Sequence, residues 1–332
     1  MIPCLNERVQ IKQLVSSLIE DSPGTDMLVV AADGGSSDGT LEILQALANA
    51  NPSVRVIANR KRLQSAGVNL AAKTFGEGRR WMVRVDAHAD YPKGYVASLI
   101  DEARRTGASS VVVSMRSSGR ACFQRAAAVA QNSVLGAGGA AHRRSGKAEF
   151  VDHGHHALFD LPRFLAVGGY DENMSHNEDA EFDVRLMRAG GKIWLTRSVD
   201  VVYFPREHPT ELFQQYRNYG RGRANTILRH NLRPKMRQML PACVLPALLG
   251  VALSPWLPLG FMPALFWIIA CLLFGAVLGV KQGRRCALAS GIAAMIIHLG
   301  WSVGFWSEMT RFAMSRIGNA MKHEPPTGMA RP

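Results

Sequence analysis

The sequence is poor in cysteine, and its cysteines are widely spaced. There are five in 332 residues, with no two separated by only two residues: Cys4, Cys122, Cys243, Cys271 and Cys286. Structural zinc sites need closely spaced ligands, and small secreted domains are dense in disulfides. We therefore expect reduced cysteines, with neither a disulfide framework nor a zinc site.

Acidic residues are scarce relative to basic ones. With 26 Asp and Glu against 39 Lys and Arg, the formal net charge is +13. Such a balance indicates phosphate-rich ligands, nucleic acid or anionic lipid as partners. Residues 240–310 have few charges and are mostly apolar, which favours lipid over nucleic acid. Because the first residues lack a charged-then-apolar signal pattern, we do not expect residues 1–239 to be exported by that route.

Apolar strands alternate with amphipathic helices through the first half of the chain. The predicted strands cover residues 27–31, 54–58, 81–85 and 109–115. This alternation predicts a mostly parallel α/β sheet that is covered on both faces. Such sheets bind ligands at the carboxyl ends of their strands. Polar turns follow the first three strands there, so we expect a ligand site at that edge.

The third of these strands leads into Asp86-Ala87-His88. A carboxylate and an imidazole two residues apart are well placed to hold a divalent cation. The alternative is a capped strand end with a surface histidine. Further along, residues 152–159 contain three histidines, which either bind metal or shape a substrate pocket. Adjacent Glu178 and Asp179 open a predicted helix, where acidic residues suit the helix dipole.

Two segments are less regular or more basic. Residues 116–149 are rich in Ala, Gly, Ser and Arg, and we expect their later part to be a mobile loop over the site or a solvated loop without function. Residues 211–223 predict an amphipathic helix with an aromatic face and basic neighbours, among them Arg217 and Arg221. This pattern suits a membrane interface, although a domain-packing helix would show it too.

The apolar third predicts membrane helices. Residues 240–257 and 261–280 are expected to form a hairpin, because prolines interrupt a run too long for one span. Residues 286–306 form a third apolar segment that spans, re-enters or lies in the interface. The basic residues before residue 240 and in the 281–285 loop indicate the cytoplasmic side.

Taken together, these motifs resemble the family 2 glycosyltransferases, and within them the membrane-attached, succinoglycan-type exopolysaccharide glucosyltransferases. The resemblance rests on six segments in order: Pro3-Cys4-Leu5-Asn6-Glu7, Asp33-Gly34-Gly35-Ser36-Ser37-Asp38-Gly39-Thr40, Asp86-Ala87-His88, Gly168-Gly169-Tyr170-Asp171-Glu172, Asn177-Glu178-Asp179 and Gln214-Gln215-Tyr216-Arg217. It implies an A-type glycosyltransferase fold, which is a nucleotide-binding, Rossmann-like mixed sheet, followed by C-terminal transmembrane helices. The expected divisions are a catalytic domain, a basic interface helix with its linker, a membrane domain of two to three helices and a basic tail, at residues 1–205, 206–239, 240–310 and 311–332.

The resemblance also implies roles for single residues. Asp179 would be the catalytic base, supported by Glu178, and Asp86 with His88 would bind Mg²⁺ or Mn²⁺ on the donor diphosphate. Asp33 would bond the uracil ring, Glu7 would face the ribose and Asp38 would support the nucleotide pocket. The residues expected to bind donor or acceptor are Pro3, Glu7, Asp33, Asp38, Arg60, Asp86, Arg217 and Arg221.

Three departures from the family pattern affect these expectations. The metal motif reads Asp-x-His where Asp-x-Asp is usual, so Asp90 is an alternative second ligand, and imidazole favours Mn²⁺ over Mg²⁺. The first strand is short at its start, and we expect the native chain to begin upstream. Asn218 stands where processive synthases carry Trp after the Gln-x-x-Arg of Gln214 and Arg217, which favours addition of a single sugar.

The resemblance therefore predicts inverting transfer of a hexose from a UDP-sugar to a polyprenyl-diphosphate-linked saccharide. It places a multi-pass protein in the inner membrane, with its catalytic domain in the cytoplasm and no nucleic-acid partner. One alternative is transfer to a polyprenyl monophosphate. Another is a non-catalytic membrane scaffold with a degenerate sugar-nucleotide domain.

Overall fold

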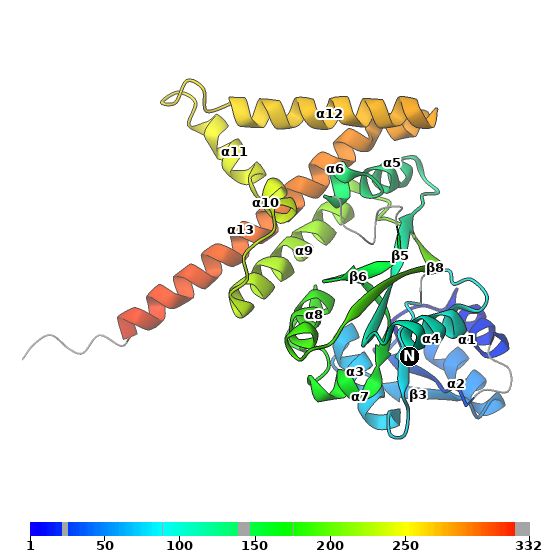
Figure 1. The fold of residues 1–332 in the computed structure, drawn as a ribbon. Coiled ribbons are helices and arrows are strands. Elements are labelled where there is room, and N and C mark those ends of the chain that lie inside the picture. The colour runs from blue at the N-terminus through cyan, green and yellow to red at the C-terminus, as the bar shows by residue number, and fades with distance from the viewer. Residues whose placement is uncertain (22–25, 88, 139–146, 175, 323–332) are drawn as a thin grey trace, which may run out of the picture.

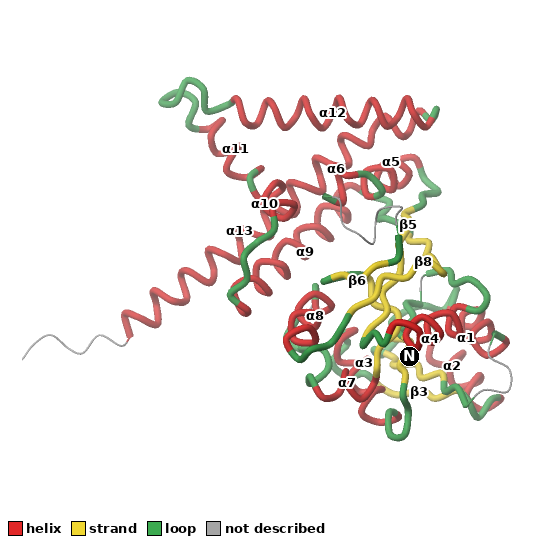
Figure 2. The backbone as a smooth tube through the Cα atoms, viewed as in Figure 1, coloured by secondary structure: helices red, strands yellow, loops and turns green. Residues whose placement is uncertain are grey.

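The computed structural model describes residues 1–21, 26–87, 89–138, 147–174 and 176–322. They form an α/β body with a group of long helices at one end (Figure 1). Strands are confined to the body, and the helical end contains none among the described residues (Figure 2). The predicted division into a sheet domain and C-terminal helices is therefore visible in the architecture.

Three parallel strands make the first sheet. In the order β1-β2-β3 they are Ile2–Cys4, Val29–Asp33 and Val54–Ala58. Cys4 pairs with Asp33, and Asp33 pairs with Ala58, so the three carboxyl ends lie at one edge as predicted. The connecting helices are α1 (Ile11–Glu20), α2 (Thr40–Ala50) and α3 (Gln64–Phe75). Helix α1 buries its residues at helical spacing against this sheet, namely Ile11, Leu14, Val15 and Leu18.

A second sheet of five strands continues the first. Its order is β4-β7-β5-β8-β6, with bounds Trp81–Val83, His155–Asp160, Ser110–Ser117, Ile193–Tyr203 and Glu149–Val151. Met1 joins the sheets, because its amino group donates to Val83 and its carbonyl accepts from Val85. Only β5 and β8 pair in parallel, so this half is mixed rather than mostly parallel. Three helices flank it: α4 (Tyr95–Thr106), α7 (Leu161–Ala166) and α8 (Glu178–Arg188).

Two sequence expectations differ from the structure in this half. The sequence predicts two strands, at residues 192–195 and 199–204, but the structure has one strand there, β8, whose pairing with β5 shifts between Val112 and Ser114. Residues 116–149, of which only the later part was expected to be a loop and for which no helix was predicted, contain the helices α5 (Cys122–Gln131) and α6 (Val134–Ala137). The alanine-rich face of α5 lacked large apolar residues to mark it, but small residues allow close packing on the C-terminal helices. The part expected to be mobile, residues 139–146, lies outside the described residues.

Six helical segments follow the sheets. They are α9 (Pro209–His230), α10 (Met236–Ala242), α11 (Val244–Ala252), α12 (Met262–Gln282), the 3₁₀ segment η2 (Arg285–Ala289) and α13 (Ser290–Lys322). Among the described residues, Met262–Gln282 and Arg285–Arg316 are long and apolar enough to cross a membrane by length and composition. The single helix predicted over 240–257 is wrong, because the chain divides at Cys243 into α10 and α11. Two prolines, Pro241 and Pro246, remove amide donors there.

The expectation of reduced cysteines is also wrong for one pair. A disulfide joins Cys122 at the start of α5 to Cys286 in η2, with Cα atoms 5.2 Å apart. The two residues are 164 positions apart in sequence, so their spacing could not reveal the pairing. They meet because α5 packs on η2 and α13. Cys4, Cys243 and Cys271 are free thiols.

Helices α9 and α13 run side by side with their backbones in contact (Figure 1). Glycines make this approach possible from both helices. A Cβ at Gly220 would meet the Trp301 carbonyl, and a Cβ at Gly304 would meet the Arg217 carbonyl oxygen. The α/β body and the apolar helices are therefore joined through a seam that tolerates no side chain at these positions.

We predict that Gly304→Ala destabilises the protein, because the added methyl group overlaps the α9 backbone. Overpacking of this kind costs about 1–3 kcal/mol. Ala313→Val is the matched control, since Ala313 is exposed on the same helix. Thermal unfolding of the purified full chain in detergent measures both variants. Equal midpoints for the two variants would show that the glycine contact is unimportant.

Candidate active site

One large cavity lies between the strand ends and the C-terminal helices. Its volume is about 1440 Å³. The loops after β1 to β4 line one end, and α10, α12 and α13 line the other. Of the residues predicted to bind or react, the lining contains Pro3, Glu7, Asp86, Glu178 and Asp179. The residues predicted in the loop after β1, in the metal motif and at the helix start therefore line one cavity.

A buried arginine connects the two acidic motifs. Arg84, only 5% exposed, donates from Nη1 to Asp179 Oδ1 at 2.8 Å, and its Nε lies 3.4 Å from Asp86 Oδ1. Tyr170 donates to the same Asp179 oxygen at 2.6 Å. Burial alone would lower the pKa of Arg84, but the charges of Asp179 and Asp86 raise it well above its usual value. Arg84 therefore stays cationic and fixes the orientation of Asp179.

Asp86 lies directly after β4, as its motif predicts. Gln64 at the start of α3 donates to its Oδ1 at 2.9 Å. On its other side, His155 Nε2 of β7 lies 3.7 Å from Oδ2. His155 also lines the cavity, so one of the three histidines noted in the sequence faces this carboxylate.

The described residues do not identify the second metal ligand that the sequence predicts. His88 lies outside the described residues. Asp90 is exposed, forms an isolated backbone bridge with Val202 and is not part of the cavity lining. Among the described residues, no group of three His, Cys, Asp or Glu side chains could hold a metal ion. Asp86 with His155 is the donor pair that faces the cavity.

Glu178 and Asp179 open α8, as expected, with different surroundings. Glu178 is almost fully buried at 8% exposure. Burial, and then the charge of Asp179, raise the pKa of Glu178 to about 7. Glu178 is therefore largely protonated below neutral pH, which limits the negative charge beside Asp179.

The carboxylates of Asp33 and Asp38 accept hydrogen bonds from residues of the surrounding loops. Asp33 accepts hydrogen bonds from the amides of Gly35 and Ser36, at 2.9 and 3.1 Å. Asp38 accepts from Thr40 and from the amide of Arg8, which ties the loop after β1 to the start of α2. Neither carboxylate is part of the cavity lining, whereas the adjacent Gly34 is. Their hydrogen bonds hold the loops after β1 and β2 in shape.

The structure does not bring the predicted arginines Arg60, Arg217 and Arg221 into the cavity lining. Arg60 is exposed. Arg217 Nη1 donates to Gln214 Oε1 at 3.4 Å, and Arg221 lies 3.8 Å from Glu308. The cavity is lined instead by four arginines in addition to Arg84, which are Arg62, Arg206, Arg223 and Arg237.

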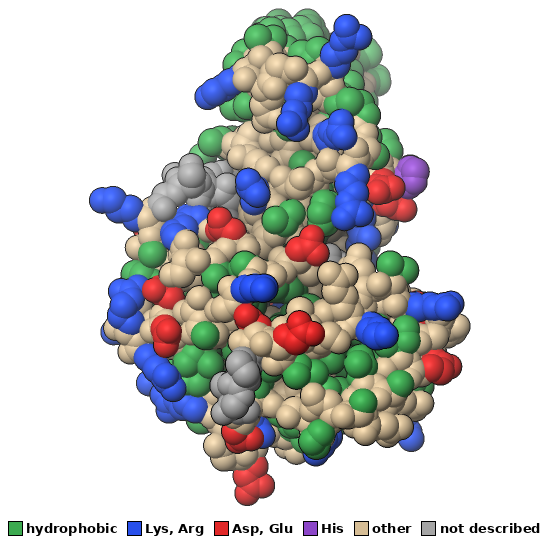
Figure 3. All heavy atoms as spheres, turned by 90° about the vertical axis from the view of Figure 1, so that its right-hand side faces the viewer, with side chains coloured by type: hydrophobic (Ala, Val, Ile, Leu, Met, Phe, Trp, Pro, Cys, Tyr) green, Lys and Arg blue, Asp and Glu red, His purple; other side chains and the backbone are tan. Residues whose placement is uncertain are grey.

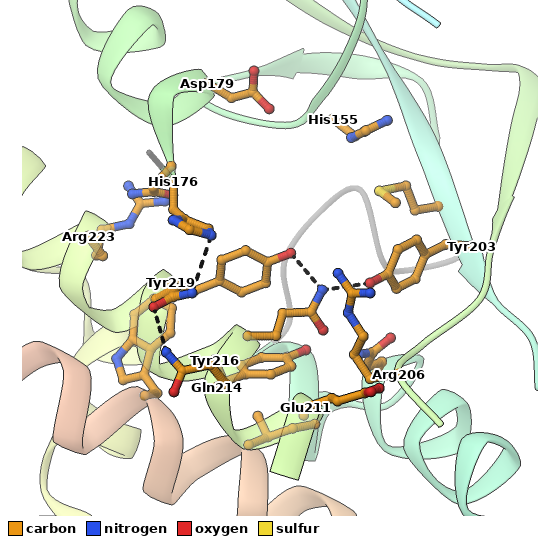
Figure 4. A pocket seen from close by; sticks show the side chains of 18 of the residues that line it. His155, His176, Asp179, Tyr203, Arg206, Glu211, Gln214, Tyr216, Tyr219 and Arg223 are labelled. Atoms are coloured by element: carbon orange, nitrogen blue, oxygen red, sulfur yellow. Dashed lines mark hydrogen bonds between the residues drawn. The ribbon is translucent and has the colours of Figure 1, made fainter. Parts of the chain in front are cut away.

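Figure 4 shows the side of α9 that faces the cavity. Tyr219 points inward, and its hydroxyl accepts a hydrogen bond from Gln215, which also bonds Tyr203. His176 bonds Asn218 and so links the loop before α8 to α9. Asp179 and His155 lie across the cavity from this face. The polar side chains of α9 therefore complete a wall opposite the acidic residues.

Comparisons with known proteins agree with this geometry. The family model described as glycosyl transferase family 2 matches residues 1–160. The succinoglycan biosynthesis protein ExoA of Rhizobium meliloti (strain 1021) is 46% identical over 312 residues, covering 94% of each chain. Among solved structures, the mannosyltransferase PcManGT from Pyrobaculum calidifontis in complex with GDP-Man and Mn²⁺ has a TM-score of 0.55 at 16% identity, covering 90% of this chain and 85% of that chain. This structural likeness confirms the predicted A-type fold.

We predict that Glu178→Gln changes the pH dependence of stability. Because the folded-state pKa of Glu178 is raised to about 7, its contribution is full at acidic pH and is lost as pH rises toward and through 7. Wild type should therefore lose stability relative to the variant between about pH 5 and pH 8. Thermal midpoints at four pH values test this, with exposed Glu77→Gln as the charge control. A constant difference between wild type and Glu178→Gln would contradict the buried titration.

Proposed function

Because this chain belongs to glycosyltransferase family 2, we propose that it moves a hexose from a UDP-sugar to a lipid-linked saccharide in exopolysaccharide synthesis. The observation that carries the proposal is a single cavity with two ends. Asp86 and Asp179, held by Arg84, lie at the strand-end side, and apolar helices form the other side. A sugar nucleotide suits the first end and a lipid carrier suits the second. The 46% identical relative is named for succinoglycan synthesis.

The donor would lie over the loops after β1, β2 and β3. Pro3 and Glu7 line the cavity there, as does Arg62, which replaces the predicted Arg60. We propose that Asp33 and Asp38 hold these loops in the shape that receives the uracil and ribose. Their hydrogen bonds to Ser36 and Thr40 support this positioning role.

The residues present fit a divalent cation. A carboxylate oxygen of Asp86 and an imidazole nitrogen of His155 face each other at 3.7 Å on the cavity wall. Carboxylate oxygen suits Mg²⁺ and Mn²⁺ alike, whereas imidazole favours Mn²⁺. We propose that Asp86 and His155, together with His88, hold the ion on the donor diphosphate. When bound, the ion supplies Lewis-acid stabilisation of the departing diphosphate.

We propose Asp179 as the general base. It would take the proton from the acceptor hydroxyl as that oxygen attacks the anomeric carbon, which inverts the configuration there. Arg84 and Tyr170 bond the same carboxylate oxygen and so hold Asp179 in one orientation. A positioned base contributes roughly 10²–10⁴-fold. The pKa of the buried Glu178 is raised to about 7, so Glu178 is largely protonated below neutral pH, which limits the negative charge beside this step.

The apolar helices would attach the protein to the cytoplasmic face of the inner membrane. Exposed large apolar side chains are concentrated in α11 and α12, among them Leu249, Phe266 and Leu273. Lys281 in the last turn of α12, and Arg284 and Arg285 just after it, are exposed. Figure 3 shows this arrangement on one face, with Lys and Arg side chains beside the apolar end. Basic residues in this position suit anionic lipid headgroups.

The contacts of η2 indicate on which side of the membrane the third apolar segment, α13, begins. Because η2 packs on α5 and is bonded to it through Cys286, the 281–285 loop lies on the side of the catalytic body. Helix α13 then runs along α9, which also belongs to that side. We therefore propose that α13 lies in the interface beneath the catalytic domain, with α11 and α12 inserted into the lipid.

We predict that Asp179→Asn abolishes transfer while UDP binding is retained. The amide keeps the shape of the side chain but cannot take a proton. Membranes containing the full chain are incubated with a panel of radiolabelled UDP-hexoses and extracted lipid acceptors. Asp101→Asn, exposed on α4, is the control and should be fully active. Normal turnover by Asp179→Asn would remove it as the base.

The product of the same assay separates the alternatives. An extended lipid-linked oligosaccharide supports the proposal. A lipid carrying one sugar would indicate transfer to a polyprenyl monophosphate, and absence of UDP release with every donor and acceptor would indicate a scaffold.

We also predict that Asp86→Ala and His155→Ala each weaken the metal-dependent part of UDP binding. Loss of one ligand should reduce the effect of Mn²⁺ by about tenfold or more. Calorimetric titration of UDP with and without Mn²⁺ measures this effect, and exposed His208→Ala is the control. If Mn²⁺ affects UDP binding by His155→Ala as strongly as it does in the control, His155 is not a metal ligand.

A further inference from the structure

The half of the cavity farthest from Asp86 has an apolar wall with no role in donor binding. It is formed by Leu240 and Pro241 of α10, Phe266, Trp267 and Phe274 of α12, and Ile297 and Trp301 of α13. Three helices that belong to the apolar end therefore contribute to the same space as the catalytic carboxylates. A sugar or a nucleotide would gain little from such a wall, whereas a hydrocarbon chain would be removed from water there.

Two arginines lie where the polar and apolar parts of the cavity meet. Arg223 comes from α9 and Arg237 from α10, and both line the cavity. The Nε of Arg223 is buried and has no hydrogen-bond partner among the described residues. Burial, and then repulsion from Arg237, lower the pKa of Arg223 to about 10. Arg223 and Arg237 are both partly buried. Asp183 offsets part of the charge of Arg223, and an anion between the two guanidinium groups would reduce the repulsion that remains.

The helices that carry the two arginines are each held in place by contacts with neighbouring elements. A Cβ at Gly222 would lie 2.6 Å from the His176 carbonyl oxygen, so α9 touches the loop that leads into Glu178 and Asp179 one residue before Arg223. On the other side, the indole of Trp301 donates to the Gln238 carbonyl at 3.2 Å and the hydroxyl of Ser302 donates to the Ala242 carbonyl at 2.8 Å. These bonds fix α10, and with it Arg237, on α13.

We propose that Arg223 and Arg237 bind the diphosphate of the lipid-linked acceptor, and that the wall of α10, α12 and α13 receives the first part of its hydrocarbon chain. This inference rests on the proposed function and names the acceptor subsite. Guanidinium groups bind phosphate oxygens in bidentate fashion, which suits this role. With the diphosphate there, the saccharide extends toward Asp179. The role expected for Arg217 and Arg221 thereby passes to two other arginines.

Binding of farnesyl diphosphate to the purified full chain in detergent tests the proposal without requiring turnover. Trp267 and Trp301 line the apolar wall, so intrinsic fluorescence reports occupancy. Inorganic diphosphate and farnesol are the headgroup-only and tail-only probes. Farnesyl diphosphate should bind more tightly than either. Equal affinity for farnesyl diphosphate and inorganic diphosphate would show that the apolar wall is not used.

The double variant Arg223→Gln, Arg237→Gln should weaken farnesyl diphosphate binding roughly 10- to 100-fold, because two charge-assisted contacts are lost. Binding of UDP should not change. Exposed Arg233→Gln, in the loop between the two helices, is the matched charge control. Weaker UDP binding by the double variant would instead assign these arginines to the donor and overturn the proposal.

Two further variants keep the test decisive if the double variant folds poorly. Arg223→Lys retains the charge and should bind with intermediate affinity. Phe274→Ser should weaken farnesyl diphosphate but not inorganic diphosphate, since it changes only the apolar wall. Unchanged farnesyl diphosphate binding in both would refute the subsite. Because these measurements involve no sugar transfer, a failure here is separate from a failure of the Asp179→Asn test.

Discussion

The site depends on one buried cation between two carboxylates. Arg84 bonds Asp179 and lies beside Asp86, although these residues come from α8 and from the end of β4. Without Arg84 the two carboxylates would face each other and the buried Glu178 with no compensating charge. Removing one partner of a buried ion pair typically costs 3–5 kcal/mol. The same interaction therefore stabilises the junction of the two elements and sets the orientation in which Asp179 can take a proton.

The sequence predicted the two carboxylates but not the residue that unites them. Asp86 and Asp179 stand in short motifs at ends of predicted elements, where local chemistry is visible. Arg84 stands two residues before Asp86, yet its partner Asp179 is 95 positions away. In sequence it is simply a basic residue near the end of an apolar strand. His155 was noted among three histidines, but only the pairing of β7 with β4 and β5 shows which histidine faces Asp86.

The sequence predicted that the helical end is apolar, but it did not predict how the helices are oriented. The aromatic side chains of residues 211–223 predict a face at the membrane interface, and Arg217 and Arg221 are separately expected to bind donor or acceptor. The orientation of α9 is instead set by glycines. Because Gly220 and Gly222 carry no side chain, the backbone of α9 can touch α13 and the loop before α8. This orientation turns Arg223 toward the cavity. Likewise, the bridge between Cys122 and Cys286 depends on how α5 packs, which no local pattern encodes.

The distribution of charge within the cavity determines how an acceptor can enter. The strand-end side carries Asp86 and Asp179, which would repel a lipid phosphate, whereas Arg223 and Arg237 lie next to the apolar helices. Under the proposed function, a diphosphate attached to a hydrocarbon chain has one favourable placement, with the chain against α12 and the sugar toward Asp179. Since α9 contacts both α13 and the loop before Asp179, the acceptor end and the catalytic end are fixed relative to each other.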